Sequence, residues 1–474
     1  MKRLLALLLF CGLLFAIRLI PTNEASQSQI AFTHVTIIDA TGAPPSLDMT
    51  VVITGDRITE IGQSQRLRVP RGAQIVDAAG KFMIPGLWDM HIHWYQKDYL
   101  PLFIANGVTG ARLMWGMPMH HQWRKDINNG SMPGPRLVIA SPIVDGPNPV
   151  WNGSVSVKDD LEARQAVIKA KQAGADFIKV YSRLTREGYL AIADEARKLG
   201  IPFAGHIPPS VTAAEASEAG QKSVEHLTTV LTACSSRDEE LRRESAAAAL
   251  DKTPNRATRS RQVTRSMLAS FDPGKAAALF AVFKRNQTWQ CPTLTVLRST
   301  AFLNDPNFIN DPRLKYMPAE TRKQWDPSGD FRFKDRTAED FELSRLVFKK
   351  QLEIVGAMRR AGVEFLAGTD ALNPYCFPGF SLHDELALLV NAGLSPMEAL
   401  QAATLNPARY LGKESDLGTL QIGKLADLVL LEANPLEDIT NTQRINAVVS
   451  NGKLIPKSEL QRMLAAIESA SNKK

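Results

Sequence analysis

The sequence predicts an α/β protein, a (β/α)8 TIM-like barrel with a small β-sandwich domain formed from the N- and C-terminal segments. From residue 84, short apolar segments alternate with amphipathic helical ones, which is typical of parallel βαβ units. Before residue 84, and again after residue 416, β-branched runs appear without helical periodicity. A chain of 474 residues is long enough for a large barrel and an accessory domain.

The same changes of pattern predict the domain boundaries. A first β segment is expected at residues 28–83, the barrel at 84–415, a second β segment at 416–456 and a C-terminal helix at 457–474. Within the barrel, two stretches are too long for simple βα loops, residues 228–288 and 298–336. Both follow strand ends, so we expect them to form a lid or a pocket wall over the active-site face.

Short strands with turn signals predict the β domain. Residues 30–40 and 74–79 are rich in β-branched residues, and residues 50–62 have a hairpin pattern around a Gly-Asp pair. Near the other end of the chain, residues 424–432 and 446–454 each have the pattern of a strand. We expect these two to pair with the N-terminal strands in one domain.

Eight barrel strands are expected, at residues 84–93, 107–114, 136–144, 176–181, 202–207, 222–227, 288–294 and 364–370. Amphipathic helices lie between most of them. The helices at residues 158–174 and 186–200 each end at a glycine, which suits the position just after a helix. Ser395 and Glu398 form a capping box with proline at the first helical position, which predicts the start of another helix.

Residues 1–27 have the features of a targeting segment. Lys2 and Arg3 precede an apolar run over residues 4–17, which is short for a membrane span of roughly 20 residues. We therefore expect a signal peptide and a secreted or periplasmic protein. An uncleaved N-terminal membrane anchor is the alternative.

The composition is that of a globular protein, with 44% hydrophobic and 22% charged residues and a net charge of +7 spread along the chain. No nucleic-acid partner is expected, because the basic run at residues 256–265 has no interleaved aromatic residues and fits a solvated helix face. The four cysteines lack zinc-motif spacing and are too few for a disulfide scaffold. Free buried thiols are favoured over a single bridge.

The strongest functional pattern is His91-Ile92-His93 at the end of an apolar strand. Side chains alternate along a strand, so both imidazoles point the same way and can chelate one metal. Four further ligand candidates lie at the ends of predicted strands 4, 5, 6 and 8, namely Lys179, His206, His226 and Asp370. Each has a structural reading when taken alone. However, four of the eight histidines stand at strand ends, where barrel enzymes hold their active sites, and this favours a metal centre.

This arrangement resembles the amidohydrolase superfamily of metal-dependent hydrolases over residues 32–455. The resemblance rests on the ligand candidates and on three further segments, residues 107–112, 403–408 and 418–428. Within the superfamily the chain is most similar to the imidazolonepropionase-like group. It is closer still to the branch with a lysine on strand 4, which includes metal-dependent Xaa-Pro dipeptidases.

The resemblance implies a binuclear centre, with His91, His93 and Asp370 for a buried ion, His206 and His226 for a more exposed ion, and Lys179, as N6-carboxylysine, for the bridge. A carbamate supplies two anionic oxygens where an ammonium group beside two cations would be disfavoured. A metal-bridged hydroxide would attack the substrate carbonyl, and Asp370 would pass its proton to the leaving amine. Two divalent ions are expected as cofactors, with zinc as the first choice and iron or manganese as alternatives.

These features predict a metal-dependent amidohydrolase, a hydrolase of carbon–nitrogen bonds other than peptide bonds, acting on a small amide, cyclic amide or dipeptide. A Xaa-Pro dipeptidase-like metallopeptidase is a specific version of this prediction. A lactonase or other ester hydrolase using the same site is one alternative. A catalytically inactive binding protein is another. The expected partner is a small-molecule substrate, and a homo-oligomer is left open.

Tyr181 and His383 are candidate substrate-binding residues. Tyr181 lies two residues past Lys179, on the same face of the strand, where it could hydrogen-bond a carbonyl or carboxylate; a packing role is the alternative. His383 opens the helix after strand 8, and helix capping is its alternative role. Arg112 is expected to make a structural ion pair within the barrel, with binding of a substrate carboxylate as the alternative.

Overall fold

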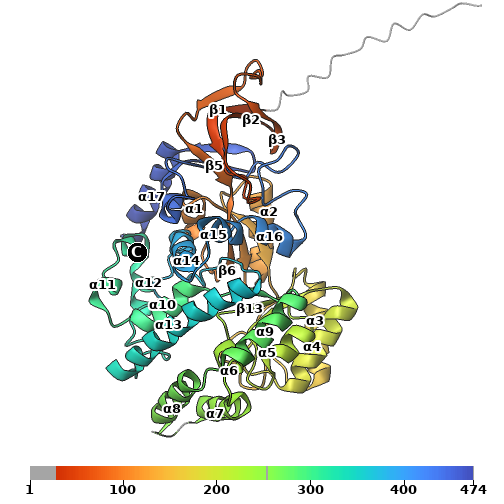
Figure 1. Ribbon diagram of the computed structural model, residues 1–474, viewed down its shortest axis with the longest axis vertical. Helices are drawn as coiled ribbons and strands as arrows, with labels where there is room; N and C mark the ends of the chain where they lie inside the picture. The colour runs from red at the N-terminus through yellow and green to blue at the C-terminus, as the bar shows by residue number, and fades with distance from the viewer. Residues whose placement is uncertain (1–27, 252, 254, 473–474) are drawn as a thin grey trace, which may run out of the picture.

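The structure is a computed structural model that describes residues 28–251, 253 and 255–472 (Figure 1). The predicted signal peptide or anchor, residues 1–27, lies outside the described residues. Within the described part of the chain, no helix is both long enough and apolar enough to cross a membrane.

Strands from both ends of the chain join in one eight-stranded sheet, at the top of Figure 1. The strands are β1 (Gln29–Ile37), β2 (Ser46–Thr54), β3 (Arg57–Gln63), β4 (Gln74–Asp77), β5 (Phe82–Pro85), β15 (Leu428–Leu431), β16 (Ile445–Ser450) and β17 (Lys453–Pro456). Their order is β17-β16-β15-β5-β1-β2-β3, and β4 pairs with β1. The antiparallel pairing of β15 with β5 joins the two segments. The second layer of a sandwich stays a prediction.

Turn chemistry explains the two hairpins of this sheet. The predicted hairpin over residues 50–62 is confirmed, because β2 and β3 pair antiparallel around Gly55, whose φ is 63°. Residues 446–454, expected as one strand, are instead the hairpin of β16 and β17. Asn451 and Gly452 both have positive φ values, 50° and 71°, and an Asn-Gly pair favours this type of tight turn.

One face of this sheet builds its own hydrophobic core. Alternate residues such as Val51 and Ile53 on β2, or Leu428 and Leu430 on β15, are buried in the same cluster. This spacing of two residues is what a strand with one buried face requires. The sheet therefore packs as a unit at the end of the barrel where the first barrel strand begins.

The barrel strands lie in two parallel sheets. One contains β6 (Leu87–Ile92), β7 (Val108–Leu113) and β8 (Arg136–Ile139). The other contains β9 (Val144–Asp145), β10 (Val155–Ser156), β11 (Ile178–Val180), β12 (Phe203–Gly205), β13 (Ser223–Glu225) and β14 (Trp289–Cys291). The predicted third strand, residues 136–144, is thus divided between β8 and β9.

No continuous ladder closes the barrel in the described residues, but isolated parallel bridges link its parts. Ala140 bridges to Phe177, between β8 and β11. The predicted eighth strand, residues 364–370, has no ladder of its own. It is held on one side by the bridge from Phe365 to Gln290, and just past its end by the bridge from Ala371 to Ile92. The result is a TIM-barrel-like α/β fold.

Helices surround the barrel, and their ends confirm the predicted caps. They are α1 (Leu100–Ala105), α2 (Pro118–Asn128), α3 (Asp160–Gln172), α4 (Arg186–Leu199), α5 (Ala213–Glu218), α6 (Val230–Ala233), α7 (Asp238–Leu250), α8 (Arg256–Ala269), α9 (Pro273–Arg285), α10 (Leu294–Phe302), α11 (Pro306–Ile309), α12 (Ala319–Gln324), α13 (Ala338–Ala361), α14 (Phe380–Asn391), α15 (Pro396–Ala402), α16 (Leu405–Leu411) and α17 (Lys457–Ser471). Gly174 and Gly200 follow α3 and α4 with φ values of 85° and 61°. The capping box of Ser395 and Glu398 starts α15.

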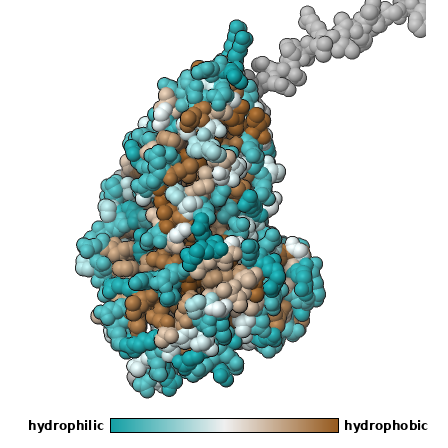
Figure 2. Space-filling model, viewed as in Figure 1, coloured by the Kyte–Doolittle hydropathy of each residue, from teal (hydrophilic) through white to brown (hydrophobic). Residues whose placement is uncertain are grey.

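The two long stretches between barrel strands are mostly helical. The first contains α6 to α9, and α7 and α8 lie side by side at the lower end of Figure 1. The second contains α11, α12 and a loop that leads into the long helix α13, which packs against α8 and α10. Figure 2 shows that hydrophilic residues cover most of this view, with hydrophobic residues between them in smaller groups.

Candidate metal centre

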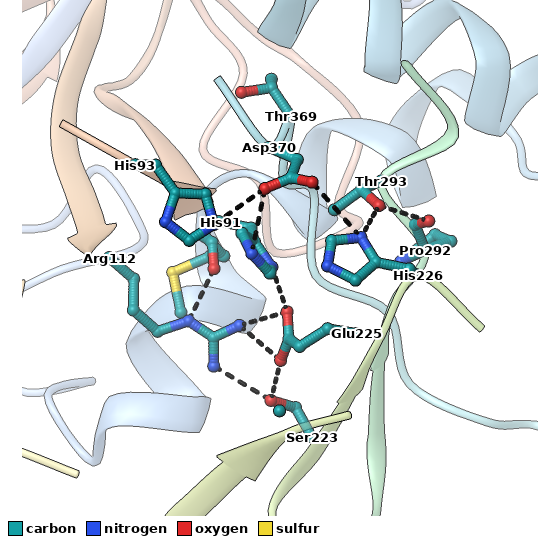
Figure 3. Close-up of polar contacts among 12 residues, drawn as sticks. His91, His93, Arg112, Ser223, Glu225, His226, Pro292, Thr293, Thr369 and Asp370 are labelled. Carbon is teal, nitrogen blue, oxygen red and sulfur yellow. Dashed lines mark hydrogen bonds and ion pairs between the residues drawn. The ribbon is translucent and has the colours of Figure 1, made fainter. Parts of the chain in front are cut away.

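Two histidines and one aspartate meet at the end of the first barrel strand (Figure 3). The Nε2 atoms of His91 and His93 lie 3.3 and 3.0 Å from the same oxygen, Oδ1 of Asp370. One ligand atom from each residue lies within 4.8 Å of the others, which is the spacing of groups that share one cation. The backbone N–H of Asp370 donates to the carbonyl of His91 over 2.7 Å, which fixes the aspartate beside β6.

Two more histidines stand next to this group. His206 follows β12 and His226 follows β13, and their rings are 4.9 Å apart. The ring of His226 is also 4.5 Å from that of His91, and its Nδ1 lies 3.8 Å from Oδ2 of Asp370. The parallel pairing of β12 and β13 brings these two residues together, because the carboxyl ends of parallel strands share one edge.

Lys179 lies on β11, completely buried, and completes the group that the sequence predicts. Its Nζ has no hydrogen-bond partner among the described residues and lies 5.7 Å from the centre of the Tyr181 ring. Burial lowers the pKa of the Lys179 ammonium to about 8, despite the opposing attraction of Glu225 and Asp370. A buried amine that loses its proton this readily is suited to react with carbon dioxide.

The donor set fits a metal ion. His91 Nε2, Lys179 Nζ and Asp370 Oδ1 are buried without a hydrogen-bond partner among the described residues. Each such atom costs about 1–3 kcal/mol when it is left unsatisfied, and a cation would satisfy atoms of this kind. Burial also lowers the pKa of His206 well below its ordinary value and that of His226 to about 4. Neutral imidazole, the form present at pH 7, is the form that binds metals.

Each of three histidines has a neighbour that orients its ring. His91 Nδ1 lies 2.7 Å from Oε2 of Glu225, and His206 Nδ1 lies 2.8 Å from the hydroxyl of Ser182. His226 Nδ1 lies 2.6 Å from Oγ1 of Thr293. Partners of this kind fix the tautomer of metal-binding histidines.

The direction of the hydrogen bonds at Thr293 follows from its second partner. The hydroxyl of Thr293 donates to the carbonyl of Pro292 over 2.7 Å, so it must accept from Nδ1 of His226. The other ring nitrogen of His226 is then left without a proton. At His91 the carboxylate of Glu225 can only accept, which likewise frees Nε2 for a cation.

Glu225 is itself held by Arg112, and both side chains are fully buried. Nη2 of Arg112 donates to both carboxylate oxygens, over 2.9 and 3.0 Å, while Nη1 donates to Tyr410 and Ser223. The structural ion pair that the sequence predicts for Arg112 is therefore confirmed. Sequence reasoning missed the role of Glu225, although a carboxylate inside a short apolar strand was the signal that could have found it.

Backbone strain gathers at this centre. Asp370, His226 and Thr293 have φ values of 59°, 58° and 48°, in the left-handed region that favours glycine. Such conformations cost about 1–3 kcal/mol each and persist where the surrounding structure imposes them. Their concentration around one group of ligand atoms indicates a functional site.

A pocket of about 640 Å³ opens above this group, and His93, His206, His226 and Asp370 are among its lining residues. Aromatic side chains supply much of its wall, namely Tyr95, Trp115, Trp151, Tyr181, Trp325 and Phe331. Residues 329–332 of the second long stretch also border the pocket. This size and this mostly apolar wall suit a small organic molecule.

The two candidate substrate-binding residues have different positions. Tyr181 lines the pocket, stacks on His206 with 4.0 Å between ring centres and accepts a hydrogen bond from Nε1 of Trp151. His383 is buried in α14, with Nδ1 2.9 Å from the hydroxyl of Thr442, and is not among the residues that line the pocket. The structure therefore does not bring His383 into this group.

Comparison with known proteins agrees with this geometry. The model of the amidohydrolase family matches residues 103–455, so the chain belongs to the amidohydrolase family. An imidazolonepropionase of Shouchella clausii (strain KSM-K16) is 32% identical over 127 residues, which are 24% of this chain and 27% of that protein. The chain thus spans about a quarter of the length of this curated relative, and less of others.

Solved structures show the same fold over most of the chain. Bottromycin amidohydrolase is 23% identical with a TM-score of 0.75, and the match covers 94% of this chain and 90% of that one. A Xaa-Pro dipeptidase with bound methionine in its active site is 20% identical with a TM-score of 0.65, covering 90% of this chain and all of the other. At this level of identity the likeness establishes the fold alone.

Proposed function

We propose that this member of the amidohydrolase family is a metal-dependent hydrolase that cleaves a carbon–nitrogen bond in a small amide, cyclic amide or dipeptide. The observation that supports the proposal best is the group of buried nitrogen ligands beside the Asp370 carboxylate, next to an aromatic pocket. Family membership supports hydrolysis of carbon–nitrogen bonds as the type of reaction.

The ligand roles divide by position. His91, His93 and Asp370 would hold one divalent cation, and His206 with His226 would hold a second. Lys179, carboxylated on Nζ, would bridge them, since its low pKa leaves part of the amine neutral at physiological pH. When bound, two such cations, with zinc as the first choice, polarise a carbonyl and make a water molecule acidic enough to act as a nucleophile.

Asp370 is placed to move the proton. Burial alone would raise its pKa, but the nearby His226, His93 and Lys179 lower the pKa below the ordinary value, so it is a carboxylate at neutral pH. It can therefore accept a proton from the attacking water and return it to the leaving amine. Asp370 is already held in position beside β6, so orienting its carboxylate costs little entropy during the reaction.

The pocket walls orient the substrate and exclude water. The Tyr181 oxygen already accepts from Trp151, so its own O–H is left to donate to a substrate carbonyl or carboxylate. The aromatic rings above the ligand group lower the local dielectric constant, which strengthens the electrostatic interactions of the reacting groups.

The N-terminal residues support an exported protein. The basic start and the apolar run of residues 4–17 are those of a signal peptide, so we place the enzyme in the periplasm or outside the cell. A membrane anchor made by the same segment is the alternative.

The test is an activity screen of the full chain purified with bicarbonate and zinc. We expect hydrolysis of at least one class among N-acyl amino acids, cyclic amides and dipeptides, its loss on treatment with a chelator, and its return with added zinc. Matched lactones and esters serve as the comparison set. Hydrolysis of lactones but of no amide would show that the activity is that of a lactonase and would contradict the proposed cleavage of a carbon–nitrogen bond. Amide hydrolysis that survives complete metal removal would contradict the proposed mechanism.

A further inference from the structure

A second cavity, of about 830 Å³, adjoins the pocket above the metal ligands. It lies between α8, α13 and the loop that precedes α13. Leu297, Thr300, Phe331 and Arg332 line both spaces, so the two are neighbours with a common wall. Phe331 stands at this boundary, where its ring meets that of Trp151 edge to face at 5.6 Å. A molecule bound over the ligand group would have to pass Phe331 to reach the second cavity.

The second cavity contains two arginines that form no direct ion pair with a described residue. Arg336 lines it and donates to the carbonyl of Thr300 and the hydroxyl of Ser344, but makes no ion pair with a described residue. Its guanidinium lies 5.0 Å from the centre of the Phe333 ring. Arg256, exposed on α8, also lines the cavity without an ion pair to a described residue.

The other arginines of this wall differ, because they are neutralised. Arg261 binds both carboxylate oxygens of Asp340 at 3.1 Å, and Arg332 pairs with Asp330 at 2.6 Å. The one remaining acid of the lining is Asp335. The lining holds four arginines and two aspartates, and Asp330, outside this lining, pairs with Arg332, so an excess of one positive charge remains and the cavity attracts anions. Asp340 and Asp330 also attract Arg336, but neither forms an ion pair with it.

We propose that the substrate is an extended amide with a carboxylate, and that this carboxylate lies in the second cavity against Arg336 and Arg256 while the scissile amide lies over the metal ligands. The proposal rests on the proposed function and names its substrate class. A guanidinium fork is suited to a carboxylate, because two parallel N–H groups match its two oxygens. Phe331 and Trp151 would contact the apolar part of the substrate between its two polar ends.

The experiment measures binding of monoanilides of dicarboxylic acids of increasing chain length, each compared with its own methyl ester. Dissociation constants are measured by calorimetry with the full chain loaded with zinc. We expect the acid to bind about tenfold more tightly than the ester at the best length, as a charged hydrogen bond provides. The Arg336→Met and Arg256→Met variants should lose this preference. The Asp335→Asn variant should increase it, because that change removes the opposing charge.

Two controls separate charge from folding. Lys334→Met removes a cation from the same loop but outside both cavities, so it should leave the preference unchanged. Arg336→Lys keeps the charge and should retain most of it, with thermal unfolding midpoints recorded for every variant. Equal affinity of acid and ester at every length, binding of neither, or a preference that persists in both arginine variants would overturn the proposal.

The outcome also separates this inference from the proposed function. A chain that prefers the acids but hydrolyses no amide would contradict the function and retain the anion-binding cavity. A chain that hydrolyses amides without any preference for acids would retain the function and contradict the cavity.

Discussion

Oε2 of Glu225 lies 2.7 Å from Nδ1 of His91, and neither side chain is exposed to solvent. Arg112 binds the same carboxylate from the other side, so a buried cation and a buried imidazole share one anion. Such an arrangement presents His91 to a metal in one tautomer and one orientation. The centre thus depends on residues that do not themselves contact a metal.

Replacing Glu225 should therefore weaken both metal binding and the fold. In Glu225→Gln, Arg112 keeps a buried charge without its anion, and we expect a loss of about 3–5 kcal/mol of unfolding free energy. Metal affinity should fall about 10–100-fold, because His91 loses its anionic partner. Urea unfolding and competition with a coloured chelator measure the two effects. The exposed pair of Glu432 and Lys457 is the control, since Glu432→Gln should cost at most about 1 kcal/mol. Unchanged metal affinity in Glu225→Gln would contradict this account.

Thr293 gives a second, more conservative test of ring orientation. Thr293→Val keeps the β-branched shape at a strained φ but removes the acceptor of the His226 Nδ1–H. We expect about 1–3 kcal/mol of destabilisation and weaker binding of one of two ions. Thr293→Ser retains the hydroxyl and should retain most of the affinity for that ion. Zinc titration followed by calorimetry distinguishes the variants, and identical titrations for valine and serine would refute the role of the hydroxyl.

Removing the hydroxyl of Tyr181 should slow turnover without changing the metal content. Tyr181→Phe keeps the ring that stacks on His206 and removes only the hydroxyl. We expect kcat/KM to fall by about one to two orders of magnitude, the effect of losing a hydrogen bond made in the transition state. Metal content should be unchanged. A loss of metal together with activity would instead assign Tyr181 to the support of His206.

Gly368 packs directly against β6, the strand that contains His91. A Cβ at this position would lie 2.6 Å from Sγ of Cys291 and 2.9 Å from the backbone nitrogen of His91. Gly368→Ala should therefore displace β6, cost about 1–3 kcal/mol and reduce metal content. Gly329→Ala is a suitable control, because its nearest atom would be 3.7 Å away. Normal stability and normal metal content in Gly368→Ala would show that the two strands can separate without disturbing the centre.

Local patterns explain what could be predicted from the sequence. The glycines after α3 and α4 and the capping box at Ser395 depend only on neighbouring residues, and all of them were found in place. The barrel strands could be located because buried parallel strands form short apolar runs. The ends of these strands could not be predicted. The predicted third strand is divided into β8 and β9, because residues 140–143 belong to neither.

Only part of the candidate site could be predicted from the sequence, and the reason is physical. His91 and His93 are close in sequence, so their shared direction follows from strand geometry alone. The contacts of Glu225 with Arg112 and of His226 with Thr293 join different strands, and only the assembled barrel reveals them. The position of His383 depends on which face of α14 turns inward, and this face packs against Thr442 rather than the pocket.

The most direct test is the metal content of the protein, purified with bicarbonate and measured by mass spectrometry beside a Lys179→Ala variant. We expect about two divalent ions per chain in the parent and a clear loss in the variant, because Lys179→Ala removes the bridging carbamate. One ion per chain in both proteins would contradict the bridged centre and assign Lys179 to the structure of the barrel. No metal in either would contradict the metal-dependent mechanism as a whole.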